Sequence, residues 1–321
     1  MPFKTTLLYL VGVVYSLVVS IRKKLYDWGV FSSFRPKAYT ISVGNLAAGG
    51  AGKTPCVIFL AEMLLKKGAC GVVLRPYKAL QEKATKPIRA ERDMPAALIG
   101  DEAAVVLHRV PQALVWVGNK QAAARLLDQQ GGQYIIIDDG FQHFGIKRDC
   151  DIVVIDAHNP FSRGRLFRER PEALSRADYI ILNEKHKPCD CSAVKQAIRR
   201  YSSAPIIHAR YVLDGFYDRT GAVVSIEKGT KVALFCAIAE PVYFKETVDL
   251  SGLEVLDSLF LPDHESCFFE ALDAFWQKAQ SRGAQYLLCT EKDIVKYKPL
   301  FPELCWLKIS MQIDEADLFM F

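Results

Sequence analysis

The chain carries the segment Gly49-Gly50-Ala51-Gly52-Lys53-Thr54, which has the composition of a phosphate-binding loop. The apolar run before it, residues 39–45, predicts a strand, and residues 55–62 after it predict a helix with proline in its first turn. In this context backbone N–H groups and the helix N-terminus can bind phosphate. The sequence therefore predicts an α/β fold that binds a nucleotide.

Two side chains of this loop have the chemistry that phosphate binding requires. Lys53 would reach the β- and γ-phosphates of a nucleotide, and the hydroxyl of Thr54 would ligate Mg²⁺. The usual loop has glycine five residues before Gly52, where this chain has Ala47. The alternative is a glycine-rich turn without function, but Gly-Lys-Thr between a strand and a helix is rarely accidental.

The composition is that of an ordinary soluble globular protein. With 321 residues, 50% of them hydrophobic, the chain can bury a sizeable core, which we expect to be divided between two domains. The net charge of +5 permits attraction to anionic lipid headgroups or phosphorylated substrates. It is too small to indicate a nucleic-acid partner.

The cysteine pattern indicates a reducing compartment. The nine cysteines are an odd number and have no repeated C-x-x-C spacing. The cluster His186, Cys189 and Cys191 could suggest a metal, but it lacks a second ligand pair at the spacing of zinc sites. The sequence therefore gives zinc little support.

The N-terminal segment is strongly apolar. Residues 5–21 form an almost unbroken apolar run followed by the basic residues 22–24. The run is at the lower limit for a membrane span, and no cleavage signal ends it. The basic cluster would keep the rest of the chain on the cytoplasmic side, and Trp28, Phe31 and Phe34 suit an interface. We expect a membrane-attached helix, spanning or lying in one leaflet; a buried core helix is the alternative.

Short apolar runs alternate with helical patterns through the first two thirds of the chain. Continuous apolar strands separated by helices predict a parallel sheet covered on both faces. The expected strands are residues 70–75, 114–117, 134–138, 152–156 and 179–183, and the expected helices are residues 101–109, 120–130 and 192–201.

The pattern changes near residue 209. Two short apolar runs, 211–213 and 222–226, flank a stretch rich in turn residues, which predicts a β-ribbon. A second α/β run follows, with strands at 231–238 and 286–290 and a helix at 267–282. We therefore expect a helix at 1–35, a phosphate-loop core domain at 36–208, a ribbon linker at 209–229 and a C-terminal α/β domain at 230–321.

Two acidic residues end one of the expected strands. Asp138 and Asp139 follow the run Ile135-Ile136-Ile137, and a carboxylate at this end of a parallel strand can lie beside the Mg²⁺ that a phosphate loop holds. The alternative is a strand-ending turn. The unusual continuation Gly140-Phe141-Gln142-His143 weighs against it.

An aspartate and a histidine form a second candidate pair. Asp101 opens a helix, where its simplest role is to complement the helix dipole, and His264 follows Asp263 in a proline-bounded loop, where surface exposure is the simplest expectation. A kinase needs a base that accepts the proton of the attacking hydroxyl, and an Asp–His pair could supply it. If these residues converge, they bring both domains together.

A basic loop leaves two alternatives open. Arg163, Arg165, Arg168 and Arg170 could hold phosphate groups or form a solvated surface.

The segment Val43-Gly44-Asn45-Leu46 and the loop after it resemble the tetraacyldisaccharide 4′-kinase (LpxK) family. The missing first glycine, at Ala47, is also the habit of that family. Further similar strings run to residue 293 and cover nearly the whole chain: Gly100-Asp101-Glu102, Asp138-Asp139-Gly140-Phe141-Gln142-His143, Arg148-Asp149, Asp263-His264 and Thr290-Glu291-Lys292-Asp293.

The resemblance implies a phosphate-loop core and a smaller α/β domain joined by a two-stranded ribbon. It implies ATP-dependent phosphorylation of the 4′-hydroxyl of a tetraacyl glucosamine disaccharide 1-phosphate, which gives lipid IVA in lipid A biosynthesis. The implied cofactors are ATP and Mg²⁺. The implied location is the cytoplasmic face of the bacterial inner membrane, where the helix would hold the enzyme at its lipid substrate. No protein partner is implied.

The resemblance also implies roles for single residues. Asp101 resembles the family's proposed catalytic base, with His264 as its partner, and Lys53 is a further catalytic residue. Residues 49–54 match the loop that binds ATP and Mg²⁺. The residues expected to contact the metal are Thr54, Asp138 and Asp139, and those expected to contact the substrate are Tyr77, Asn119, Gln142, His143 and Arg168.

The chain departs from the family pattern at three places. It has Arg75-Pro76-Tyr77-Lys78 where Arg-Gly-Tyr-Gly is usual, Asn119-Lys120 where arginines are common, and a different loop at 161–170. We therefore do not carry over the family's nucleotide-base or sugar contacts to the loop at 161–170, and we expect acceptor contacts near Asn119 that differ from those of other members.

Two rival classes fit the sequence poorly. A GTP switch needs Asn/Thr-Lys-x-Asp, and in Thr290-Glu291-Lys292-Asp293 the lysine and aspartate are adjacent. A partitioning-type ATPase carries lysine before the Gly-Gly of its loop, where this chain has Ala48. A membrane-tethered module that holds nucleotide without chemistry stays open, and so does a soluble sugar acceptor.

Overall fold

A computed structural model describes residues 2–47, 49–161, 166–185, 189–265, 267–297, 301 and 303–313. Its N-terminal half contains a mostly parallel group of strands. They are β1 (Tyr39–Gly44), β2 (Cys70–Leu74), β3 (Ile88–Arg89), β4 (Leu114–Val117), β5 (Tyr134–Asp138), β6 (Cys150–Asp156) and β7 (Tyr179–Asn183). Of these, β3 pairs antiparallel to β4 at the edge.

Helices cover both faces of this half. They are α2 (Lys53–Leu65), α3 (Ala96–Ile99), α4 (Asp101–Arg109), α5 (Lys120–Gln129) and α6 (Ser192–Arg199), with 3-10 helices at Leu80–Lys83 and Pro171–Arg176. Alternate side chains of β5 enter different cores: Ile136 packs in the core that contains α2, and Ile135 and Ile137 pack with α5. The expected parallel sheet with two covered faces is confirmed, because β-branched runs bury both sides of each strand.

The C-terminal half has its own strands, helices and core. The strands are β10 (Lys231–Cys236), β11 (Glu254–Phe260), β12 (Tyr286–Thr290) and β13 (Leu304–Ile313), and the helices are α7 (Pro241–Leu250), α8 (Phe269–Ser281) and α9 (Glu291–Tyr297). Phe235 on β10 packs with Leu287 of β12 and Trp276 of α8.

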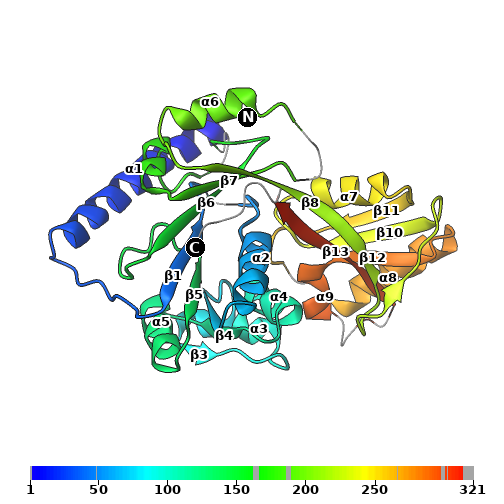
Figure 1. Cartoon of the computed structure of the whole chain (residues 1–321). Helices are drawn as coiled ribbons and strands as arrows, with labels where there is room; N and C mark the ends of the chain where they lie inside the picture. Colours follow the sequence, from blue (N-terminus) through cyan, green and yellow to red (C-terminus); the bar gives the residue numbers. More distant parts are fainter. Residues whose placement is uncertain are drawn as a thin grey trace.

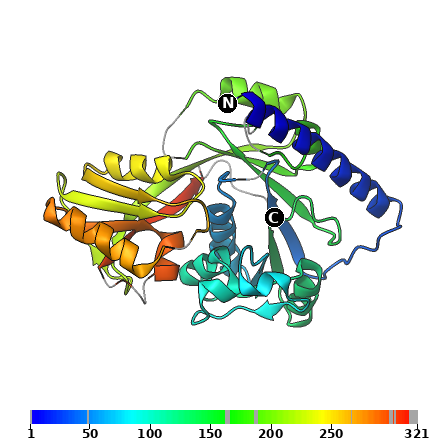
Figure 2. The same ribbon diagram turned by 180° about the vertical axis from the view of Figure 1, so that it is seen from behind.

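A long strand joins the two halves into one 13-stranded sheet. This strand, β8 (Ile206–Tyr217), pairs parallel with β7 and antiparallel with β13, from Ala209↔Ile313 to Tyr217↔Trp306. The strand order is β11-β10-β12-β13-β8-β7-β6-β1-β5-β2-β4-β3, and β9 (Val223–Val224) pairs with β8. In Figures 1 and 2, β8 and β13 cross together between the two halves.

The ribbon differs in detail from the expected one. Its second strand is β13, and the segment near 222–226 contributes only the short β9. Gly215, with φ of 142°, lies where the β8–β13 register shifts, so the strand continues past Asp214. The turn comes later, where the Asp218 carboxylate accepts hydrogen bonds from Thr220 N and Ala222 N at 2.8 and 3.0 Å.

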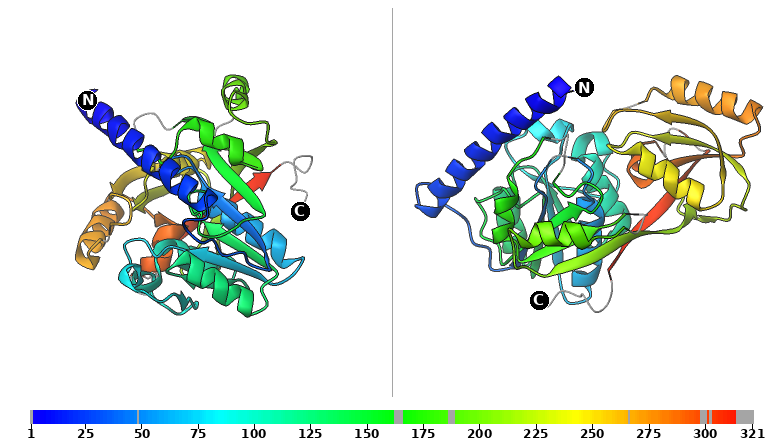
Figure 3. Two further views of the ribbon diagram at one scale, coloured as in Figure 1. Left: turned by 90° about the vertical axis from the view of Figure 1, so that its left-hand side faces the viewer. Right: turned by 90° about the horizontal axis from the view of Figure 1, so that it is seen from above.

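The N-terminal helix α1 (Pro2–Asp27) lies along the outside of the molecule (Figure 3). It extends beyond the apolar run, and on its last turn Lys23 and Asp27 form an ion pair at 2.6 Å. Most large apolar side chains described on it are exposed, whereas Val19 is buried. Within the described residues, no helix combines the length and the apolar character needed to cross a membrane.

Candidate active site

The phosphate loop connects β1 to α2 and is supported by the neighbouring strands. Gly52 precedes the helix with φ of 98°, a conformation that favours glycine. Asn183 at the end of β7 donates hydrogen bonds from Nδ2 to the Ala51 carbonyl, at 3.0 Å, and to the Tyr211 hydroxyl, at 2.9 Å. A Cβ atom at Gly52 would collide with both Tyr211 Oη and Asn183 Nδ2.

Replacing Gly52 with alanine should therefore remove nucleotide binding and lower the free energy of unfolding. The unfavourable φ alone costs about 1–2 kcal/mol, and the collision displaces the loop. Thermal melting with and without ATP measures both effects. Gly221→Ala is the matched control, because Gly221 has φ of 89° but no atom of the described residues lies within 4 Å of the added Cβ. The account would be contradicted if the two variants melted at the same temperature and if ATP raised that temperature by the same amount in both.

Two carboxylates lie beside this loop. Register pairs Val43 at the end of β1 with Asp138 at the end of β5. Asp139 has φ of 51° and forms ion pairs with Lys53, at 3.5 Å, and with Arg168. Lys120 Nζ donates to the main-chain carbonyls of Asp138 and Asp139, both at 2.7 Å. The left-handed backbone of Asp139 and the two hydrogen bonds from Lys120 thus hold the main chain that carries the two acids.

The two carboxylates differ in their affinity for protons. Burial and the charge of Asp139 raise the pKa of Asp138 to about 6. Burial would raise the pKa of Asp139 as well, but the charges of Lys53, Arg168 and Lys120 outweigh it and hold the pKa well below its usual value. Asp139 is therefore a fixed negative charge, whereas Asp138 is a carboxylate whose charge lacks full compensation.

The residues present fit a magnesium ion. Asp138 Oδ1 is buried and has no hydrogen-bond partner in the described part of the chain. Thr54, in the first turn of α2, supplies a hydroxyl, and oxygen donors are the ligands that Mg²⁺ prefers. Thr54, Asp138 and Asp139 are therefore the candidate magnesium ligands.

A second cluster joins the two halves of the molecule. His264, in the loop after β11, lies with Nδ1 3.0 Å from Asp101 Oδ2 at the start of α4. Lys296 Nζ donates to the same carboxylate oxygen at 3.2 Å, and Lys292 Nζ lies 3.0 Å from His264 Nε2. The contacts are all satisfied if Nδ1–H donates to Asp101 and Nε2 accepts from Lys292.

The environment of Asp101 keeps it ionised. Burial would raise its pKa, but the hydrogen bond from His264 and the charges of Lys296 and Lys292 outweigh burial and lower it. His264 has φ of 63°, a strained backbone of the kind found at functional sites. Asp101 is thus a carboxylate held in place by groups from the opposite half of the sheet.

Glu102 connects the Asp101–His264 pair, the dyad, to the paired acids Asp138 and Asp139. Its Oε1 lies 3.4 Å from His264 Nε2, and its buried Oε2 has no hydrogen-bond partner within the described ranges. The charge of Glu102 also contributes to the raised pKa of Asp138. The ring of Tyr77 packs edge-on against His264 at 5.1 Å. The dyad, the acids and the phosphate loop therefore form one continuous polar site.

Comparison with known proteins identifies the family. The model of the family described as tetraacyldisaccharide-1-P 4′-kinase (LpxK) matches residues 4–320. The chain belongs to this family. It is 33% identical over 318 residues to the tetraacyldisaccharide 4′-kinase of Anaeromyxobacter dehalogenans, covering 93% of this chain and 83% of that protein. It is 31% identical to the Chlamydia caviae enzyme of the same name, covering 94% and 84%.

The fold agrees with this assignment. A crystal structure of LpxK from Aquifex aeolicus in complex with ATP superimposes with a TM-score of 0.74 at 21% identity, covering 97% of this chain and 96% of that one. The architecture of the family is therefore present across almost the whole chain.

The residues expected to contact substrate have varied surroundings in this kinase. Tyr77 lies beside the dyad and Arg168 beside Asp139. Asn119 caps α5 by accepting a hydrogen bond from Ala122 N at 3.0 Å. The side-chain amide of Gln142 donates hydrogen bonds to the Asn45 carbonyl and to the Glu169 carboxylate. Burial, with nearby positive charges, lowers the pKa of His143 to about 3, so its ring is neutral.

Some residues named from the sequence lie outside the described residues. They are Ala48, residues 162–165 with Arg163 and Arg165, and His186.

Sequence reasoning assigned no role to several residues of the site. The dyad is surrounded by Glu102, Lys292 and Lys296. The main chain of the paired acids accepts hydrogen bonds from Lys120, and the phosphate loop is supported by Asn183. Glu102 and Lys292 stood inside strings that resemble the family, which was the available signal. Lys296 and Lys120 resemble surface lysines in sequence, and only their contacts in the structure show otherwise.

Proposed function

We propose that this kinase transfers the γ-phosphoryl group of ATP to the 4′-hydroxyl of an acylated glucosamine disaccharide 1-phosphate. Family membership supports ATP-dependent phosphorylation in lipid A biosynthesis. The structural observation that carries the proposal is the Asp101–His264 contact. This contact supports the proposal because transfer to a hydroxyl requires a base near the phosphate loop, and the Asp101 carboxylate, held by the other half of the molecule, is our candidate for that base.

In this proposal each group has a separate task. Lys53 and the loop amides stabilise charge on the transferring phosphoryl group, where such catalysis gains most of its power. Asp101 accepts the proton of the sugar hydroxyl, and His264 orients Asp101 and shares the charge. Thr54, Asp138 and Asp139 would hold Mg²⁺, which neutralises phosphate charge when it is bound.

The alternative is a membrane-attached nucleotide switch or ATPase. The structure gives the string at 290–293 a different task from guanine recognition. Lys292 binds Asp263 at 2.7 Å and contacts His264, and the buried Asp293 accepts hydrogen bonds from Thr290 Oγ1 and Ala237 N. This string therefore supports the dyad loop, and it favours the kinase.

The test is transfer of label from γ-labelled ATP to an acylated disaccharide 1-phosphate in detergent micelles with Mg²⁺. GTP and a de-acylated acceptor are run in parallel. Labelled lipid formed from ATP and only with the acylated acceptor supports the proposal. Nucleotide hydrolysis without labelled lipid would favour the switch or ATPase.

The exposed face of α1 supports attachment to the cytoplasmic surface of the inner membrane. The side chains of Leu10, Val14, Leu17, Val18 and Ile21 are each more than half exposed and recur at helical spacing. Basic residues 22–24 follow this stripe, as in helices that lie in the interface of anionic bilayers. In this location the enzyme would meet its acylated substrate at high local concentration.

Leu17→Glu should weaken binding to vesicles that contain anionic lipid by roughly tenfold or more, since burial of a leucine contributes about 1.5–3 kcal/mol. Co-sedimentation with the vesicles measures the bound fraction. Val242→Glu is the control, because Val242 is equally exposed on α7. Unchanged binding of the Leu17 variant would rule out this face as the attachment surface.

We also propose that the boundaries at 208 and 229 separate two domains that move relative to one another. The Asp101–His264 contact spans them, so closure would complete the site and exclude water.

A further inference from the structure

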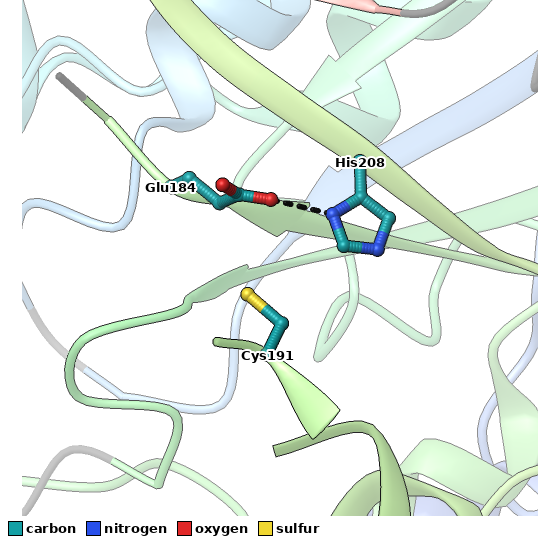
Figure 4. Close-up of side chains that lie close together, drawn as sticks. All are labelled: Glu184, Cys191 and His208. Atoms are coloured by element: carbon teal, nitrogen blue, oxygen red, sulfur yellow. Dashed lines mark hydrogen bonds and ion pairs between the residues drawn. The ribbon is translucent and has the colours of Figure 1, made fainter. Parts of the chain in front are cut away.

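A second cluster of metal-binding side chains lies outside the kinase site. Glu184 follows β7, His208 is on β8 and Cys191 precedes α6, and one ligand atom from each lies within 4.8 Å of the others. Glu184 Oε1 is 2.5 Å from His208 Nδ1, and Cys189 Sγ is 3.1 Å from Cys191 Sγ. Figure 4 shows the Cys191 thiol directed toward the Glu184–His208 pair.

The backbone fixes this arrangement. His208 is paired in register with Leu182 on the neighbouring parallel strand, and Glu184 N donates to the Ala209 carbonyl at 2.8 Å. Two ligands thus project from adjacent strands, and the chain returns to add Cys191 at the start of α6. The sequence alone gave zinc little support because the second pair of ligands comes from β7 and β8, not from a nearby Cys or His repeat.

Two side chains of this cluster have the properties of potential metal ligands. Cys191 is buried, and burial, followed by Cys189 and Glu184, raises the pKa of its thiol to about 12. His208 Nε2 is buried and has no hydrogen-bond partner in the part of the chain that the structure describes. Thiol, imidazole and carboxylate are all potential metal ligands.

The lysine that follows Glu184 in the sequence has other partners. Lys185 directly follows Glu184, but its Nζ binds Asp156 at 2.7 Å and Glu240 at 2.5 Å. These two carboxylates occupy its charge, so it does not compensate Glu184.

We propose that Glu184, Cys191 and His208 bind a zinc ion, with Cys189 supplying the fourth ligand. Thiolate and imidazole select a thiophilic divalent cation, and zinc accepts a carboxylate beside them. On binding, the Cys189 and Cys191 thiols become thiolates and each releases its proton to solvent, while His208 binds as the neutral imidazole and keeps one ring proton, so two protons leave as the cation enters. A cavity of about 680 Å³, lined by Glu184 and His208 among others, provides access.

The consequence of binding is structural. Asn183, whose side chain holds the phosphate loop, immediately precedes Glu184. A zinc ion would fasten Glu184, Cys189 and Cys191 to His208 of β8 and so stabilise the support of that loop.

The test measures metal directly. The full chain, purified under reducing conditions, is stripped with a chelator and loaded with Co²⁺ or Zn²⁺ alone. We expect one equivalent of zinc by elemental analysis, a thiolate-to-cobalt charge-transfer band, and melting several degrees higher with zinc than without it. Cys191→Ser and His208→Gln should lose the band and the bound zinc. Cys267→Ser is the control, since Cys267 lies in the loop before α8, and it should retain both.

The wild-type spectrum keeps the proposal testable even if a variant fails to fold. A folded wild-type chain that shows no charge-transfer band with Co²⁺ and retains no zinc would overturn it. Zinc binding that persists unchanged in both Cys191→Ser and His208→Gln would overturn it as well. Neither result depends on kinase activity, so this proposal and the proposed function can fail separately.

Discussion

Replacing Asp101 with asparagine is expected to lower kcat by about 10²–10⁴-fold, the range that a positioned general base contributes. Asparagine keeps the size of the side chain but cannot accept the proton of the sugar hydroxyl. The KM for ATP should change little, because the phosphate loop and Lys53 remain intact. Label transfer to the lipid acceptor gives kcat, and titration with ATP gives the KM for ATP.

The control for Asp101→Asn is Asp249→Asn, because Asp249 is on the surface of α7, where it pairs only with Lys245 among the ion pairs of the described residues. It should retain full turnover. His264→Gln should give a smaller loss than Asp101→Asn, since the base remains. Turnover of the Asp101 variant near that of the wild type would show that another group accepts the proton.

Replacing Lys53 with alanine is expected to lower kcat/KM for ATP by about 10²–10³-fold, the effect of removing one preorganised donor from a transition-state charge. Lys53 is largely buried beside Asp139, so no solvent-exposed lysine can take its place. The loss should fall mainly on kcat if Lys53 acts on the transferring phosphoryl group. Initial rates over a range of ATP concentrations separate kcat from KM.

Lys66→Ala is the control for the Lys53 variant, because Lys66 caps the opposite end of the same helix and is exposed. It should leave both kinetic constants unchanged. If Lys53→Ala raised only KM, Lys53 would bind ATP without acting in the transfer step.

The parallel strands of the N-terminal half could be predicted closely from the sequence. Residues 114–117, 134–138 and 179–183 form strands with the expected bounds, because each is a short apolar run that is buried on both faces. The helix at 101–109 also has the expected bounds, since charged and apolar residues alternate at helical spacing.

Elements that depend on distant partners were not predicted. β13 pairs with β8 across 89 residues of sequence at Tyr217↔Trp306 and 104 at Ala209↔Ile313, and nothing local specifies that register. The sequence interpretation also omitted β11, α7 and α9. α9 begins directly after β12 without a loop, so the end of the strand gives no turn signal.

The site shows the same division between local and distant signals. The phosphate loop and the strand-ending acids are local patterns and could be read directly. Asp101 and His264 are 163 residues apart, so local patterns left open whether they meet; the resemblance implied their pairing, and the structure places them in contact. The roles of these residues and the substrate contacts of Tyr77, Asn119, Gln142, His143 and Arg168 stay predictions.

The most direct test of the central claim is the position of the new phosphate in the lipid product. The wild-type enzyme is incubated with γ-labelled ATP, Mg²⁺ and the acylated disaccharide 1-phosphate in micelles, and the purified product is analysed by mass spectrometry and phosphorus NMR. The account predicts one labelled phosphate monoester at the 4′-hydroxyl, formed much more slowly by the Asp101→Asn variant. Label found only in free phosphate, or on another hydroxyl, would contradict it.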